Sequence, residues 1–420
     1  MRNIAPALLA SGLALLGGAV AGISPAAQAK EPKGAPAAPK MNPKILKPLQ
    51  AANELAKAGK FAEAAAEIQS ADAVPDKTPF EQYQIDELGC FVLIKDKKYD
   101  AGAKACDRSL NSGLLPPEMV NDRLRLLAQL FPQTEPRDLA KSAEYSKRWL
   151  EATGTRDPLM LFLAGQSAYF TNNYGEAITY MKEAVAVTKN AGNKPEENWL
   201  RILQSSYAKL KNDPGVIEST TELVRYYPNK DYWSTLSRGL LTRAAGKDRQ
   251  ILQVFRLMYQ VDAMEDADDF LEAASSATLQ GSPGEALKFM EKGFASGILT
   301  TSGDKAKSSA VLADSKRLAA SDQKSLPQFE KEAIAAKAGE ADVKLGEAYL
   351  SYDQPAKGLE AIQRGMGKGG VKSLDESNLA LGRAYMLTKN SAEAVKAFEL
   401  VKGPEYAQLA QLWAIYAAQQ

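Results

Sequence analysis

Apolar residues recur along this chain at the three- and four-residue spacing of amphipathic helices, and polar turns interrupt them at intervals. Near the start of this pattern, Leu49, Ala52 and Leu55 lead to a turn at Gly59, and the spacing resumes from Ala64. Two apolar-faced helices joined by a short turn form a helical hairpin. Because this arrangement repeats almost to the end of the chain, the sequence predicts an all-α protein.

Small and large residues mark one hairpin most clearly. The segment Leu381-Gly382-Arg383-Ala384-Tyr385 precedes Ala392-Glu393-Ala394, and a related phrase surrounds Gly346, 36 residues before Gly382. A glycine lets two antiparallel helices approach closely, and large residues such as Phe398 fill the space beside it. One hairpin cannot bury its apolar face alone, so hairpins of this kind stack on one another.

These phrases resemble the tetratricopeptide repeat family, over roughly two-thirds of the chain that follows the N-terminal leader. The resemblance implies a right-handed α-α superhelix of stacked hairpins, a solenoid. Its concave face, lined by the first helix of each hairpin, would bind peptides or other proteins. Transferred onto this sequence, the family pattern places these residues in the partner-binding groove: Gln166, Tyr169, Phe170, Gln204, Tyr207, Arg238, Glu347, Leu350, Arg383 and Met386.

The aromatic run from Arg225 to Trp233 is similar to a segment of exported Gram-negative repeat proteins that accompany TonB-type energy-transduction systems. That narrower resemblance implies a link to TonB-type transport. The alternative is plain packing, with Trp233 as a core residue between two hairpins.

The first 29 residues have the pattern of a secretory signal peptide. Arg2 supplies the positive start, an apolar run extends from Ile4 to Ile23, and Ala27-Gln28-Ala29 forms a small-residue cleavage site. We expect cleavage between Ala29 and Lys30, and a periplasmic location in a Gram-negative bacterium. The apolar run is long enough to remain as an uncleaved anchor, but the cleavage site favours a mature chain without stable membrane insertion.

Changes in pattern divide the rest of the chain. The predicted segments are a flexible linker rich in Pro, Ala and Lys (30–46), tetratricopeptide-like hairpins (47–298), an irregular helical insert (299–338), two further hairpins (339–402) and a C-terminal capping helix (403–420). The capping helix is expected to dock one face, with Leu409, Leu412 and Tyr416, and to expose the other to water.

The charge and the missing residue types exclude several functions. Lys and Arg together number 52 and Asp and Glu 51, so no dominant positive field favours nucleic acid. The chain has no His, which excludes Ser-His-Asp triads and His-ligated zinc. A glycine-rich run at 365–370 follows a helix instead of a strand, and an acidic cluster at 262–272 lacks the loop spacing of an EF-hand. We therefore predict no catalytic residue, cofactor or metal.

The two cysteines of the chain lie at equal distances from one predicted turn. Cys90 and Cys106 each stand eight residues from Lys98, so antiparallel helices bring them to the same height above the turn. In an oxidising compartment this placement predicts a disulfide, with two separate buried thiols as the alternative.

Two functions are consistent with these patterns. The first is a non-catalytic periplasmic scaffold that binds another cell-envelope protein, or an extended segment of one, in its groove. The second is a protein that binds or cleaves cell-wall peptidoglycan on a helical-repeat support. The repeat pattern continues to about residue 401 and leaves no room for a separate catalytic domain, which favours the scaffold.

Overall fold

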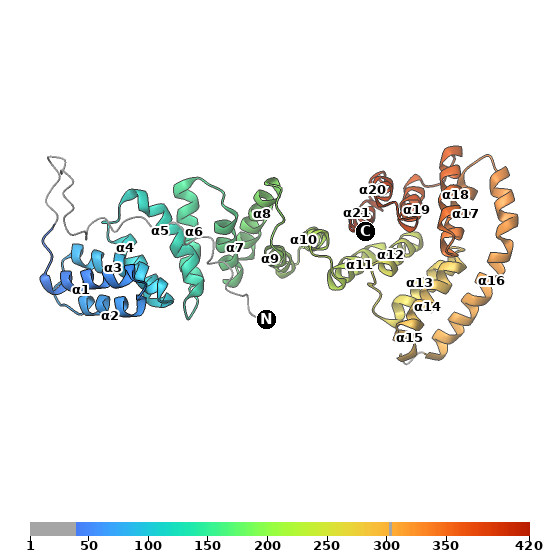
Figure 1. The fold of residues 1–420 in the computed structure, drawn as a ribbon. Coiled ribbons are helices and arrows are strands. Elements are labelled where there is room, and N and C mark those ends of the chain that lie inside the picture. The colour runs from blue at the N-terminus through green and yellow to red at the C-terminus, as the bar shows by residue number, and fades with distance from the viewer. Residues whose placement is uncertain (1–38, 302–304) are drawn as a thin grey trace. The chain divides into compact units, whose positions relative to one another are not determined.

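A computed structural model describes residues 39–301 and 305–420 of the chain (Figure 1). The predicted signal peptide, its cleavage site at Ala29 and Lys30, and most of the predicted linker lie outside the described residues. Throughout the described part every regular element is a helix and no strand occurs, which confirms the all-α prediction. The chain forms two compact units, of which unit 1 extends to Leu210 and unit 2 begins at Lys211. This division falls inside the range 47–298, which the sequence pattern treats as one set of hairpins.

Unit 1 is a stack of helices in which each helix packs on the next along the chain. Its elements are α1 (Pro43–Lys57), α2 (Phe61–Asp72), α3 (Pro79–Lys95), α4 (Tyr99–Asn111), α5 (Pro117–Leu130), the short 3-10 helix η3 (Phe131–Gln133), α6 (Leu139–Thr153), α7 (Pro158–Phe170), α8 (Tyr174–Asn190) and α9 (Glu197–Lys209). Local chemistry sets some of the boundaries. At the start of α3, for example, the Thr78 hydroxyl accepts a hydrogen bond from the Glu81 backbone N–H, and the Glu81 carboxylate accepts one from the Thr78 N–H.

The hairpin turns share one backbone conformation. In several hairpins of both units, the residue two positions before the second helix has a positive φ; these residues are Gly59, Lys97, Asn172, Gly246, Gly281, Asp353 and Lys389. A left-handed residue at this place ends the first helix and reverses the chain. Glycine, Asn and Asp adopt this conformation at little cost, whereas the two lysines adopt it against their intrinsic preference.

A disulfide joins Cys90 of α3 to Cys106 of α4, with 2.07 Å between the sulfur atoms. The pairing predicted from the equal spacing around Lys98 is therefore confirmed. The bridge fixes the second hairpin of unit 1, where both cysteines are buried.

Unit 2 contains the remaining helices. These are α10 (Asp213–Tyr226), α11 (Lys230–Ala244), α12 (Asp248–Gln260), α13 (Ala267–Leu279), α14 (Pro283–Ala295), α15 (Ile298–Thr301), α16 (Lys305–Ala335), α17 (Glu340–Ser351), α18 (Pro355–Lys368), α19 (Leu374–Leu387), α20 (Ser391–Glu399) and α21 (Ala407–Ala417). Most of the range expected to be an irregular insert is one long helix, α16, which packs against α13, α14 and α17. Because α16 has no partner in a hairpin of its own, the small-and-large pattern of the repeats is missing there.

Unit 2 closes into a ring, since its last helix, α21, packs against α10 and α12 near the unit's start (Figure 1). The Gln419 amide donates to the Val224 carbonyl at 2.7 Å, and the Tyr416 ring meets Trp233 edge to face. Trp233 is buried, as the packing interpretation of the aromatic run predicted. The expected capping helix is thus the helix that closes the ring. Ala410, Trp413 and Ile415 are buried in addition to Leu409 and Leu412, whereas Ala407 and Gln411 are exposed.

The glycine-rich run at 365–370 differs from the loop that its composition indicates. Gly365 to Lys368 form the last turn of α18, and only Gly369 and Gly370 follow the helix. A Cβ atom at Gly365 would lie 2.6 Å from the Gly339 carbonyl oxygen, so this glycine allows two backbones to approach closely.

Candidate functional site

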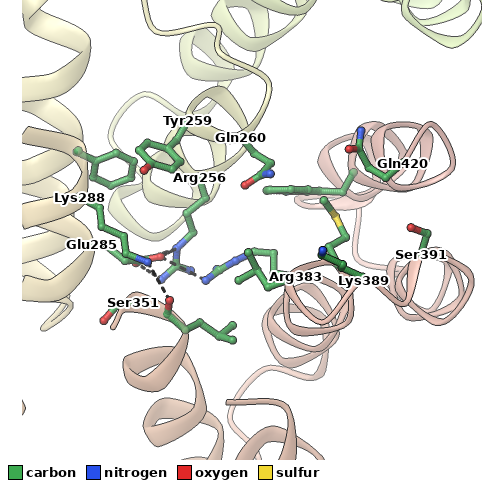
Figure 2. A pocket seen from close by; sticks show the side chains of 15 residues that line it. Arg256, Tyr259, Gln260, Glu285, Lys288, Ser351, Arg383, Lys389, Ser391 and Gln420 are labelled. Carbon is green, nitrogen blue, oxygen red and sulfur yellow. Dashed lines mark hydrogen bonds and ion pairs between the residues drawn. The ribbon is translucent and has the colours of Figure 1, made fainter. Parts of the chain in front are cut away.

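A cavity of about 380 Å³ lies inside unit 2 (Figure 2). Its walls come from α12, α14, α17, α19, α20 and α21. The lining residues are Arg256, Tyr259, Gln260, Glu285, Lys288, Phe289, Leu350, Ser351, Arg383, Met386, Leu387, Lys389, Ser391, Trp413 and Gln420. This volume is within the range of pockets that bind small molecules.

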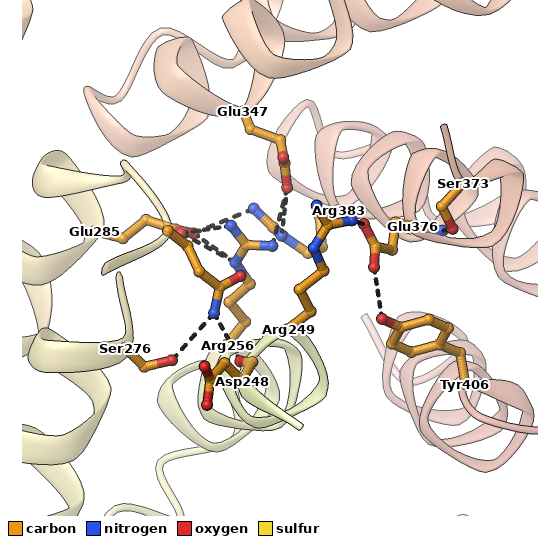
Figure 3. Close-up of polar contacts among 11 residues, drawn as sticks. Asp248, Arg249, Arg256, Ser276, Glu285, Glu347, Ser373, Glu376, Arg383 and Tyr406 are labelled. Atoms are coloured by element: carbon orange, nitrogen blue, oxygen red, sulfur yellow. Dashed lines mark hydrogen bonds and ion pairs between the residues drawn. The ribbon is translucent and has the colours of Figure 1, made fainter. Parts of the chain in front are cut away.

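Four charged side chains meet beside the cavity and form a buried network, here called the Arg–Glu quartet: Arg256, Glu285, Glu347 and Arg383 (Figure 3). Arg256 binds both carboxylate oxygens of Glu285, with contacts of 2.6 to 3.0 Å, and its Nη1 donates to Glu347 Oε1 at 2.9 Å. Arg383 reaches the same two carboxylates at longer range, 3.3 Å to Glu285 and 3.5 Å to Glu347. The quartet thus joins α12, α14, α17 and α19.

Burial and neighbouring charges shift the pKa values within the quartet in different directions. Burial alone would raise the pKa of the Glu285 carboxyl, but the positive charges of Arg256 and Arg383 outweigh it and hold that pKa below its usual value. Burial would lower the pKa of Arg256, yet the two glutamates raise it on balance. For Arg383, burial and repulsion by Arg256 together leave the pKa lowered. Arg256 is therefore well compensated by its partners, and Arg383 is compensated less completely.

Removing one member of such a quartet is costly. A buried ion pair gains little over apolar packing, but one buried charge left without its partner costs several kcal/mol. The Arg256 and Arg383 side chains are only 7% and 8% exposed, so water cannot replace a lost carboxylate. The quartet therefore favours the one arrangement of helices in which all four charges meet.

The predicted groove residues of unit 2 lie on the first helices of their hairpins, and three of them share the cavity. Leu350, Arg383 and Met386 line it. Glu347 does not line it but pairs with both arginines of the quartet. Arg238 lies apart, where it binds both carboxylate oxygens of Asp269, at 2.8 and 2.9 Å.

Asp269 belongs to the acidic cluster at 262–272, which was not expected to bind calcium because it lacks the loop spacing of an EF-hand. Together with Asp266 it forms a capping box at the start of α13. Carboxylates are stabilised at this end of a helix by the free N–H groups.

The predicted groove residues of unit 1 lie on α7 and α9. The Phe170 side chain is 60% exposed, and its ring packs edge to face on Tyr169 at 5.4 Å between centroids. Tyr169 also contacts the Tyr174 ring, and its hydroxyl shares a 2.8 Å hydrogen bond with the Ser205 hydroxyl of α9. Phe170, Tyr169 and Tyr174 are here called the aromatic patch.

The remaining predicted residues of unit 1 differ in exposure. Gln166 and Gln204 are half-buried on the same two helices, whereas Tyr207 is buried and available only for packing.

The sequence analysis missed three important cavity residues: Arg256, Glu285 and Trp413. Arg256 had a detectable signal, since it interrupts the apolar run from Val254 to Met258. A charged residue in the middle of a buried helix must find a partner. Glu285 and Trp413 carried no comparable signal, because Glu285 stands in a repeat phrase, Gly284-Glu285-Ala286, and Trp413 fits the apolar face of its own helix.

Within residues 39–301 and 305–420, no group of three or more His, Cys, Asp or Glu side chains is arranged to hold a metal ion. No helix of the same ranges combines the length and the apolar character needed to cross a membrane.

Comparison with known proteins supports no family assignment. No family model and no curated protein matches the chain. Among solved structures, it resembles the C-terminal part of a TPR repeat-containing protein from Cytophaga hutchinsonii, with 16% identity and a TM-score of 0.34, over 62% of this chain and 98% of that one. It also resembles the TPR domain of P58(IPK), with 13% identity and a TM-score of 0.22, over 89% and 97%. A third match is a chain of Naa15/Naa10 bound to HypK-THB, with 16% identity and a TM-score of 0.31, over 87% and 59%.

These scores are too low to carry an argument about function. The fold class follows from the helices themselves: the chain is an all-α protein of stacked, tetratricopeptide-like hairpins.

Proposed function

We propose that this protein is a non-catalytic scaffold of the bacterial periplasm that binds an extended segment of another cell-envelope protein on α7 and α9 of unit 1. The observation that carries this proposal is the aromatic patch, in which Phe170 stays 60% exposed while Tyr169 is held by Ser205. A large aromatic side chain costs free energy in water unless a partner covers it. Rigid aromatic residues also contribute much of the binding energy of protein interfaces.

The half-buried Gln166 and Gln204 lie on the same two helices. Amide side chains next to an apolar anchor suit the backbone of an extended segment, which offers both hydrogen-bond donors and acceptors. The partner segment would therefore place an apolar side chain on Phe170 and its backbone beside the Gln166 amide.

Two features support the periplasmic location. The N-terminal pattern ending in Ala29 is that of an exported protein, and the disulfide between Cys90 and Cys106 suits an oxidising compartment. Sequencing the N-terminus of the protein recovered from the periplasm should give a chain that begins at Lys30. The similarity of the run from Arg225 to Trp233 to proteins that accompany TonB-type systems makes a component of such a system the first partner to test.

A photo-crosslinking amino acid at position 170 tests the proposed surface in intact cells. We expect an ultraviolet-dependent adduct with one envelope protein, which mass spectrometry then identifies. The matched control is the same amino acid at Leu114, another exposed large apolar residue of unit 1, which stands between α4 and α5. Equal labelling at both positions, or none at 170, would refute the assignment of this surface.

The Phe170→Ala substitution gives a second readout. It should weaken binding of the identified partner by about 2 kcal/mol, or roughly 30-fold, as expected for a central aromatic anchor. The melting temperature should stay unchanged, because most of this side chain is in water. Incubation with purified peptidoglycan separates the other candidate function, since release of soluble fragments would contradict a non-catalytic scaffold.

A further inference from the structure

The cavity of unit 2 combines an apolar wall with cationic groups. Phe289 and Leu350 are buried in the wall, Met386 is half-buried, and Leu387 remains 45% exposed despite its size. These side chains come from α14, α17 and α19. Contact with an apolar molecule would remove their apolar surface from water, which is favourable.

Arg383 has donor capacity that its protein partners do not use fully. Its guanidinium carries five N–H donors, and its contacts within the quartet are the two long ones, at 3.3 and 3.5 Å. Charge-assisted N–H···O bonds are usually 2.7–2.9 Å long. Glu285 and Glu347 are already held at 2.6 to 3.0 Å by Arg256, so they cannot move toward Arg383 without losing those bonds.

The Trp413 indole supplies a second unused donor. Trp413 lines the cavity and is 2% exposed, and its Nε1 atom has no hydrogen-bond partner in the described part of the chain. Its ring is fixed by stacking on Phe398, with centroids 5.6 Å apart. A buried N–H without an acceptor is destabilising, so an acceptor atom at this place would be favourable.

The lysines of the cavity differ in how far they are neutralised. Lys288 pairs with Asp353 at 2.5 Å and also donates to the Leu350 carbonyl. Lys389, in the turn before α20, also lines the cavity (Figure 2). Within the described residues it forms no ion pair. Among the lining side chains four are cationic and only Glu285 is acidic, and Glu347 and Asp353 pair with three of the four cations.

We propose that this cavity binds a small amphipathic carboxylate, with its apolar body against Phe289, Met386 and Leu387 and its carboxylate at Arg383 and Lys389. The carboxylate supplies the acceptors that Arg383 lacks and a counter-charge for Lys389. A cavity of about 380 Å³ between six helices is of a size that suits a small molecule. This site is separate from the partner surface of unit 1 and does not depend on it.

Isothermal titration calorimetry with two carboxylates and their uncharged amides tests the chemistry. The probes are 4-phenylbutyrate with 4-phenylbutyramide and octanoate with octanamide, so each pair shares its apolar body. We expect at least one carboxylate to bind about 10-fold or more tightly than its amide, because hydrogen bonds to charged groups are the stronger ones. If neither carboxylate binds better than its amide, the proposal is wrong.

Variants of the full chain test the location. Met386→Trp fills the cavity and should weaken carboxylate binding at least about 10-fold. Leu279→Trp, at a leucine of unit 2 that is 78% exposed, is the matched control and should leave binding unchanged. Lys389→Gln should reduce the preference for the carboxylate over the amide and leave amide binding intact.

Arg383→Gln should abolish the preference for the carboxylate, but it also removes a member of the quartet and can unfold unit 2. The Met386 and Lys389 variants decide the location in that case, provided that their melting temperatures match that of the unmodified protein. Unchanged carboxylate binding in Met386→Trp would overturn the assignment to this cavity. Phe170→Ala should leave carboxylate binding intact, so the two proposed sites can fail separately.

Discussion

Substituting Gly382 by alanine tests the close helix contact on which the repeat pattern depends. A Cβ atom at this position would lie 2.4 Å from Phe398 Cε1, whereas ordinary contacts begin at 3.4 Å. The Phe398 ring would have to retreat by about 1.0 Å, the difference between these distances. It cannot do so freely, because it is buried and stacks on Trp413. Overpacking of this kind costs about 1–3 kcal/mol.

Gly239→Ala is the matched control, since Gly239 lies within α11 and its added Cβ would meet no atom within 4 Å. Alanine favours a helix over glycine by about 1 kcal/mol, and this gain applies to both variants. The free energy of unfolding should therefore be lower for Gly382→Ala than for Gly239→Ala by about 1–3 kcal/mol.

Urea unfolding, followed by circular dichroism and by tryptophan fluorescence in a Trp149→Phe, Trp199→Phe background that leaves only Trp233 and Trp413 of unit 2, measures this difference. A difference under about 0.5 kcal/mol would show that the Phe398 ring yields easily and that the contact does not require glycine.

Two further predictions concern a covalent bond and a buried charge. Thiol titration of the denatured, unreduced protein should find no free thiol, and two free thiols would contradict the bridge. Replacing Cys90 and Cys106 by serine should lower the free energy of unfolding by about 3 kcal/mol, as expected for a loop of this length. Glu285→Gln should cost about 3 kcal/mol because it leaves the Arg256 charge incompletely compensated, whereas Glu393→Gln, in an exposed pair, should change stability by less than about 0.5 kcal/mol. Since the pKa of Glu285 is below its usual 4.5, its stabilising contribution is complete above about pH 4.5 and is lost as the pH falls through the lowered value. The urea midpoint should fall in acid less steeply for Glu285→Gln than for the unmodified protein, and equal slopes would refute this role of the carboxylate.

Features that depend on neighbours in sequence were predictable from the sequence alone. The helical period predicted the hairpins, and the equal spacing of Cys90 and Cys106 around Lys98 predicted their bond. The prediction at Gly382 was also local, because Phe398 belongs to the partner helix of the same hairpin. In each case a short turn fixes which side chains face each other, so no long-range information is needed.

The tertiary structure alone decided the closure of unit 2 and the chemistry of its cavity. Arg256 meets Glu347 across 91 positions of the chain, and Arg383 meets Glu285 across 98. No local spacing encodes such contacts, since they depend on how each hairpin turns relative to the last and on where α16 and α21 pack. The family pattern placed Arg383 on a concave surface, and the ring places it in the wall of a cavity together with residues from five other helices. The periodicity of one helix sets which of its faces is buried, and only the completed ring determines which distant face covers it.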